Sequence, residues 1–206
     1  MENNEPAGKI PEQVKGSKTD TQTSKTLNTE EEARQLFGIA KQKLLNVSKW
    51  HTYAGAGTAD FQLTDREGAA VTRLAQKGDH FRINIPGPGS KTGDGDDWVQ
   101  IQEITDESTS DSESAAIRVG PATNPQNSKK DVAHFFKEDA SSTFIVQRRG
   151  KEVSAEVHGR NEEPNTEAED FIDKARNLIV AAGAIVGLSE VQWKSLVNGL
   201  LDPNID

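Results

Sequence analysis

The apolar residues of this chain change their spacing twice, and these changes restrict the folds that the chain can adopt. From residue 33 to residue 47, apolar side chains recur every three or four positions, which is typical of an amphipathic helix. From residue 59 to about residue 158, short segments alternate apolar and polar side chains, as strands do when they bury one face. From residue 168 onward the helical spacing returns. The pattern predicts an α+β protein in which helices flank a run of strands.

The first helix is predicted to begin after Asn28 and Thr29 and to end near Trp50. Thr29 and Glu32 have the spacing of a capping box, in which two side chains satisfy the first free backbone N–H groups of a helix. Acidic residues open this segment and lysines close it, which matches the helix dipole.

About seven short strands are predicted after this helix. Parallel neighbours would need crossover connections of a dozen or more residues, so we expect antiparallel pairing. The last two strands flank Arg149 and Gly150 and are expected to form a hairpin. The predicted strands cover residues 59–64, 70–74, 80–85, 98–104, 115–119, 143–148 and 152–158.

The C-terminal third is predicted to be helical. Thr166 and Glu169 have capping-box spacing, and a long apolar face continues as far as Gly187, which fits the position after a helix end. A last helix is predicted after Ser189, with Trp193 on its apolar face. A short helix is also expected from Ser128.

An antiparallel sheet that curls around a long C-terminal helix, with a further helix at the N-terminal side, would bury the apolar faces of all these elements. This order of elements resembles the helix-grip arrangement of START-like lipid-binding domains. The resemblance lies in element order and in no residue motif, so no function is taken from it. The alternative fold is a small β-barrel built from residues 58–120 with helices outside.

Residues 1–28 have almost no apolar side chains to bury and carry as many lysines as acidic residues. Such a composition is typical of a solvated, disordered tail. We therefore expect a disordered tail over residues 1–28 and a single α+β domain over residues 29–206.

The composition argues against several classes of protein. The net charge of −9 and the lack of a basic patch disfavour nucleic-acid binding. The chain has no cysteine, which excludes disulfides, thiolate metal sites and a cysteine nucleophile. Its most apolar run, residues 178–188, is too short to span a bilayer, and residues 1–25 contain no secretory signal. We expect a cytoplasmic protein.

The most unusual segment is the loop from Pro86 to Trp98, which is rich in glycine and aspartate. It does not have the glycine spacing of a phosphate-binding loop. Nor does it fit a calcium-binding EF-hand loop, because Trp98 and Thr105 stand where that pattern requires ligands. A mobile connection and a ligand lid remain open as interpretations of this loop.

Polar side chains at strand positions give the candidate ligand site. The four histidines do not have the spacing of metal ligands, so neither a metal nor a cofactor is expected. His158 and Arg160 lie in a dense polar run at the end of a predicted strand, where a base and an anion-binding group could act together. The candidate ligand-binding residues are His80, Arg82, Trp98, His158 and Arg160.

Two functional hypotheses follow from these observations. No complete catalytic constellation is present, which favours a non-enzymatic binding or adaptor module. The alternative is a domain that binds or processes a small ligand in a polar pocket built from the five candidate residues. The expected partner is a protein or a small apolar or amphipathic ligand. A structure with the five side chains around one cavity would favour the hypothesis of a small-ligand domain. A filled interior with the five side chains dispersed would favour the hypothesis of an adaptor module.

Overall fold

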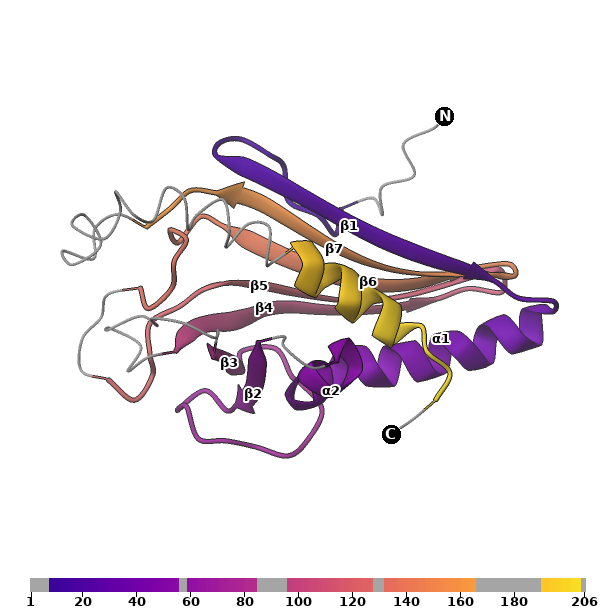
Figure 1. Ribbon diagram of the computed structural model, residues 1–206, viewed down its shortest axis with the longest axis horizontal. Helices are drawn as coiled ribbons and strands as arrows, with labels where there is room; N and C mark the ends of the chain where they lie inside the picture. Colours follow the sequence, from indigo (N-terminus) through magenta and orange to yellow (C-terminus); the bar gives the residue numbers. More distant parts are fainter. Residues whose placement is uncertain (1–7, 56–58, 85–95, 128–131, 166–189, 205–206) are drawn as a thin grey trace.

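The computed structural model describes residues 8–55, 59–84, 96–127, 132–165 and 190–204. Its central element is a seven-stranded antiparallel sheet in the order β1-β7-β6-β5-β4-β3-β2 (Figure 1). β1 and β2 form the two edges and do not pair with each other in the described residues, so the sheet is not closed into a barrel. The strands are β1 (Ser17–Thr26), β2 (Asp60–Thr64), β3 (His80–Asn84), β4 (Asp97–Ser108), β5 (Ser112–Pro121), β6 (Ser141–Arg149) and β7 (Glu152–Glu162).

The first helix, α1 (Glu30–Leu45), begins where the sequence predicts. Thr29 is its N-cap, and the capping box with Glu32 is complete. The helix ends earlier than predicted, and a 3-10 turn, η1 (Val47–Lys49), leads into the short helix α2 (Trp50–Ala54). The change of direction buries Trp50, whose indole N–H donates to two carbonyl oxygens at the end of α1.

The two faces of the sheet have different surroundings. The inner face carries Phe144 on β6 and Val157 on β7, and it packs against α1 and the C-terminal helix. The opposite, outer face carries Thr143 on β6 and His158 on β7. On the inner side, Trp50 and Phe144 have ring centroids 4.6 Å apart. They belong to a connected cluster of aromatic rings on this side of the sheet: Trp50, Phe61, Phe81, Phe144 and Trp193.

The C-terminal helix is described over residues 190–200, and its last turn is fixed to the rest of the core. The buried ammonium of Lys43 donates to the carbonyl oxygens of Gly199 and Asp202. Gly199 lies so close to the carbonyl of Tyr53 that a Cβ atom there would collide with it. The predicted part of this helix from Thr166 to Gly187 lies outside the described residues.

The fold class predicted from the sequence is confirmed: the protein is α+β, with a seven-stranded antiparallel sheet, an N-terminal helix and a C-terminal helix in a helix-grip-like arrangement. The barrel alternative is wrong, because the sheet has two free edges. The hairpin at Arg149 and Gly150 is confirmed as the β6–β7 connection, where Gly150 has a φ of 56°.

None of the described helices is long and apolar enough to cross a membrane.

The prediction of a disordered tail through residue 28 is wrong for residues 17–26, which form β1. This strand pairs with β7 from Ser17 opposite Glu162 to Thr26 opposite Glu152. An edge strand receives its stabilisation largely from main-chain hydrogen bonds, so it needs few apolar side chains. Thr21 is the one residue of β1 that is buried.

The predicted strand over residues 70–74 is absent. Only an isolated bridge joins Thr64 to Ala70, and the N–H of Ala75 donates to the carbonyl of Leu45 instead of to a strand. The sheet still has seven strands, because it includes β1, which the sequence analysis did not predict, and lacks the segment 70–74. Of the short helix predicted from Ser128, residues 128–131 are outside the described part, and Val132 makes an isolated bridge with Thr123.

Candidate functional site: a polar cavity on the outer face

A row of polar residues crosses five strands on the outer face. The residues are direct partners from strand to strand, so their side chains project on the same side of the sheet. A register shift between Ile101 and Glu103 turns Glu103 to this face, where strict alternation would have placed it inside. In strand order the row is Glu103 on β4, Arg118 on β5, Thr143 on β6, His158 on β7 and Asp20 on β1.

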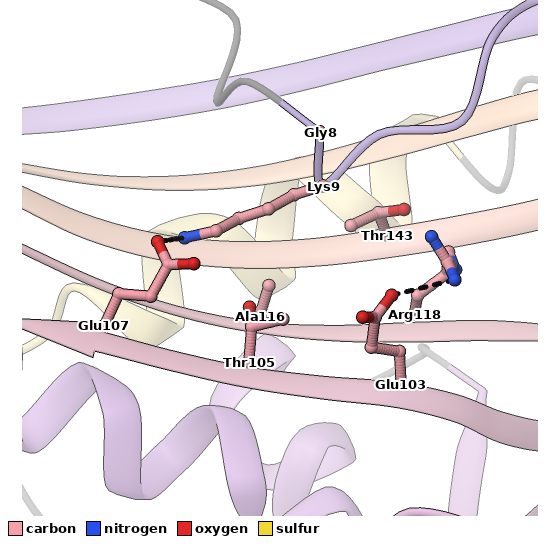
Figure 2. A pocket seen from close by; sticks show the side chains of 8 residues that line it. All are labelled: Gly8, Lys9, Glu103, Thr105, Glu107, Ala116, Arg118 and Thr143. Atoms are coloured by element: carbon pink, nitrogen blue, oxygen red, sulfur yellow. Dashed lines mark ion pairs between the residues drawn. The ribbon is translucent and has the colours of Figure 1, made fainter.

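The segment that precedes β1 lies over this row. Lys9 reaches β4 and β5, where its ammonium pairs with Glu107 at 2.8 Å and also donates to Ser114 (Figure 2). At the other end of the segment, the Asn161 side-chain oxygen accepts hydrogen bonds from the backbone N–H groups of Val14 and Lys15. Asn161 has a φ of 56°, a conformation that asparagine tolerates better than most residues. Residues 8–16 are thus attached to the outer face at both ends.

A cavity of about 170 Å³ remains between this segment and the sheet. Two ion pairs stand at its ends, Lys9 with Glu107 and Arg118 with Glu103, each with an N–O distance of 2.8 Å (Figure 2). Between them lie short side chains from β4, β5 and β6. The lining residues are Gly8, Lys9, Glu103, Thr105, Glu107, Ala116, Arg118 and Thr143.

Two hydroxyl groups of the cavity lining are buried without a hydrogen-bond partner in the part of the chain that the structure describes. They are the Oγ1 atoms of Thr105 and Thr143. Thr143 has no exposed surface. Most buried polar groups in proteins are hydrogen-bonded, because an unsatisfied one costs about 1–3 kcal/mol. Both hydroxyls border the cavity, but their oxygen atoms are almost fully covered, so a ligand can bond to them only if neighbouring side chains shift.

A hydrogen-bonded network continues the row beyond Thr143. His158 Nδ1 lies 2.7 Å from Asp20 Oδ1, and His158 Nε2 lies 3.0 Å from Glu156 Oε2. Arg160 Nη1 lies 2.7 Å from the same oxygen of Asp20. Gln147 and Ser154 both donate to the other oxygen of Glu156. Ionised carboxylates only accept hydrogen bonds, so both imidazole nitrogens of His158 act as donors.

The pKa values in this network follow from these contacts. Burial lowers the pKa of His158, but hydrogen bonds to Glu156 and Asp20 outweigh burial and leave the pKa above its ordinary value. Burial raises the pKa of Glu156, but the hydrogen bonds from His158 and Ser154 outweigh it, and the net pKa is lowered. The pKa of Asp20 is lowered in the same way by His158 and Arg160. The network thus favours a protonated histidine between two carboxylates.

The five candidate residues from the sequence do not surround one cavity; the structure places them in two groups. His158 and Arg160 lie on β7 and share Asp20. The other three lie on β3 and β4, on the far side of β6 and β5. Arg82 is the direct cross-strand partner of Trp98 and lies 3.5 Å from Asp96. A ligand role for either group stays a prediction.

Within the second group, His80 and Trp98 are buried, and His80 Nδ1 has no partner in the described part of the chain. Burial lowers the pKa of His80. Next to Trp98, Asp97 is buried on the opposite side of β4, and burial together with the neighbouring Asp96 raises its pKa to about 7.

Of the loop from Pro86 to Trp98, residues 86–95 lie outside the described part of the chain. Among the residues that are described, no group of three histidine, aspartate or glutamate side chains is placed to hold a metal ion.

Sequence reasoning did not find the cavity residues. Thr105 and Thr143 look like any outward-facing strand residue, and Lys9 lies in the segment predicted to be disordered. The alternation of Thr143 with the apolar Phe144 and Val146 indicates that its side chain faces away from the core. It does not indicate what covers that face.

No protein-family model and no curated protein sequence matches the chain. Solved structures with a similar arrangement include the Helicobacter pylori protein jhp0584, with 13% identity, a TM-score of 0.48, and coverage of 89% of this chain and 87% of that one. An uncharacterised Bacillus thuringiensis protein has 14% identity, a TM-score of 0.40 and coverage of 90% and 100%. The major latex-like protein 151 of Panax ginseng has 14% identity, a TM-score of 0.36 and coverage of 84% and 97%. These similarities are too distant to transfer a function.

Proposed function

We propose that this protein is a non-enzymatic binding module that takes up a small polar molecule in the cavity on its outer face. The observation that carries the proposal is the hydroxyl of Thr143, which borders the cavity, is fully buried and has no hydrogen-bond partner among the described residues. Valine has nearly the same shape as threonine but no hydroxyl, so it would pack equally well at this position. The unsatisfied hydroxyl of Thr143 therefore lowers the stability of the fold without improving its packing. A bound molecule that hydrogen-bonds to Thr143 would remove this penalty.

The lining favours binding over catalysis. Its four charged side chains are engaged in two ion pairs, and none of the eight lining residues is a histidine. Within residues 8–55, 59–84, 96–127, 132–165 and 190–204, no base is hydrogen-bonded to the hydroxyls of Thr105 and Thr143 to activate them as nucleophiles. The groups present can orient a polar molecule and compensate its charges.

The nature of the lining also defines the kind of ligand. Apart from Gly8 and Ala116, every lining side chain carries a charge or a hydroxyl. An apolar ligand would exclude water from these charged and hydroxyl groups without offering them hydrogen bonds, which opposes binding. On the inner side, Trp50, Phe144 and Trp193 pack against one another instead of lining the polar cavity. The proposed ligand is therefore polar.

The proposal is tested by ligand-observed NMR on the full chain, with mixtures of small amino acids, carboxylates, amines and diols at millimolar concentration. At least one class should show saturation transfer with the wild-type protein. The signal should be lost in Thr143→Val, which removes the hydroxyl and keeps the side-chain shape. It should persist in Ser142→Ala, because Ser142 is the next residue on β6 and faces the opposite side of the sheet.

Two results would contradict the proposal. Equal signals from the wild type and Thr143→Val would place the binding elsewhere on the protein. No signal from any class of compound would refute a polar binding site at this cavity.

A further inference from the structure

From the charges around the cavity, we infer that its ligand is a small zwitterion with an ammonium and a carboxylate group at the two ends of a short carbon chain. This inference rests on the proposed function, and it specifies the chemical class of the ligand.

The charges of the cavity lining cancel. Lys9 and Arg118 supply two positive charges, and Glu103 and Glu107 supply two negative ones. A ligand with a net charge would leave that charge uncompensated in a site partly shielded from water, which opposes binding. A molecule with one charge of each sign adds no net charge.

Both ends of the cavity retain unused hydrogen-bonding groups. The ammonium of Lys9 has three N–H groups, and its recorded partners are Glu107 and Ser114. The guanidinium of Arg118 has five N–H groups, and its recorded contact in the described chain joins Nη2 to Glu103. Each glutamate uses its Oε2 atom in the ion pair, which leaves Oε1 as an acceptor. Each end can therefore bind an ammonium or a carboxylate.

The spacing of the ion pairs favours a ligand whose charges are separated. Glu103 and Glu107 are four residues apart on β4, which corresponds to about 13 Å between their Cα atoms at roughly 3.3 Å per residue. Their side chains approach each other over the floor of the cavity, where Thr105 and Ala116 lie side by side (Figure 2). The methyl group of Ala116 lines the cavity between the two ion pairs and can contact a carbon chain.

The inference is tested with four compounds of equal chain length: 4-aminobutanoate, butanoate, butylammonium and butane-1,4-diol. Dissociation constants are measured by NMR titration of the full chain. We expect 4-aminobutanoate to bind about tenfold or more tightly than either singly charged compound, because each charged end adds charge-assisted hydrogen bonds. Arg118→Met removes one of the two cationic groups that can bind the carboxylate, so the affinity for 4-aminobutanoate should fall toward that for butylammonium.

Arg34→Met is the matched control, because Arg34 forms its ion pair with Glu30 on α1, outside the cavity lining. It should leave all four affinities unchanged, and circular dichroism establishes that both variants are folded. If the diol binds as tightly as 4-aminobutanoate, the zwitterion inference is overturned while the polar binding site stands. If none of the four compounds binds but another polar class does, the inference is likewise overturned. If no polar compound binds, both the zwitterion inference and the proposed function are refuted.

Discussion

His158 on β7 and Asp20 on β1 are direct cross-strand partners, and the imidazole Nδ1 lies 2.7 Å from the carboxylate Oδ1. This contact joins the edge strand to the sheet on its outer face, beside the polar cavity. The other imidazole nitrogen, Nε2, donates a hydrogen bond to Glu156, which lies on the same strand as His158. The stability of the β1–β7 edge therefore depends on the charge of one histidine.

The first prediction concerns pH. The folded-state pKa of His158 is raised, so its contribution to stability is fully present below the unfolded value of 6.5 and is lost as the pH rises through the folded value. His158→Gln should thus reduce the free energy of unfolding by about 1–3 kcal/mol at pH 5.5 and by less at pH 8.5. Urea unfolding at the two pH values measures this. His51→Gln, an exposed substitution outside the network, is the control, and an equal loss at both values for His158→Gln would contradict the prediction.

The second prediction concerns Asp97, whose pKa burial raises to about 7. A raised carboxyl pKa means that folding disfavours the ionised form, so stability is lost as the pH rises from about 4 to about 7. Asp97→Asn should remove this loss. Relative to the wild type, the variant should gain up to about 4 kcal/mol between pH 3.5 and pH 8, measured by urea unfolding. A pH-independent difference would show that the pKa of Asp97 is the same in the folded and the unfolded protein, which would contradict the prediction.

The third prediction concerns the unpartnered hydroxyl of Thr143. In the absence of ligand, Thr143→Val should raise the free energy of unfolding by about 1 kcal/mol or more, because it removes a buried polar group that makes no hydrogen bond to any described residue. Thr143→Ser keeps the hydroxyl and should not be stabilised. Thermal unfolding of the three proteins measures this effect, and a loss of stability in Thr143→Val would indicate that an ordered water satisfies the hydroxyl.

The fourth prediction concerns the anchoring of the C-terminal helix by Lys43. Lys43→Met removes the ammonium that donates to the carbonyl groups of Gly199 and Asp202, of which Gly199 keeps the hydrogen bond from the Asp202 N–H. The free energy of unfolding should fall by about 2–4 kcal/mol. Lys41→Met removes an ion pair with Asp106 nearer the surface and should reduce it by less than about 1 kcal/mol. Denaturant unfolding of both variants provides the comparison, and similar losses would exclude a special role for Lys43.

The fifth prediction tests whether residues 17–26 form a strand. Thr21 is buried opposite Val157, so Thr21→Asp would place a charge against the apolar inner face. We expect a loss of about 1–3 kcal/mol or more in the free energy of unfolding. Ser24→Asp introduces the same charge at an exposed position of β1 and should have little effect. If residues 17–26 were disordered, the two variants would have equal stability in urea unfolding.

The features predicted correctly from the sequence are those that depend on nearby residues. The capping box of Thr29 and Glu32 lies within one helical turn, and the β6–β7 hairpin is defined by residues on either side of Gly150. β1 was missed because its stabilisation comes from β7, which is far away in the sequence. Its alternating Thr19, Thr21 and Thr23 were a signal for a strand, since threonine is enriched in strands.

The cavity could not be predicted because it depends on register. Glu103, Arg118 and Thr143 come from three strands and meet only in the observed pairing. The register shift before Glu103 also reverses the side on which a strict alternation would place it. A sequence pattern identifies which residues leave the core, but it does not identify which of them become neighbours.

The pairing of β1 with β7 also sets the order in which the molecule can be completed. Residues 17–26 are synthesised before any other strand, yet their partners, residues 152–162, form the last one. During synthesis, residues 17–26 therefore have no strand to pair with until β7 has left the ribosome, when nearly the whole sheet has been made. Contacts between such distant segments slow folding, so closure of this edge is expected to be the late step in maturation of the protein. The polar side chains of residues 17–26, which led the sequence analysis to miss β1, keep this unpaired segment soluble until it pairs with β7.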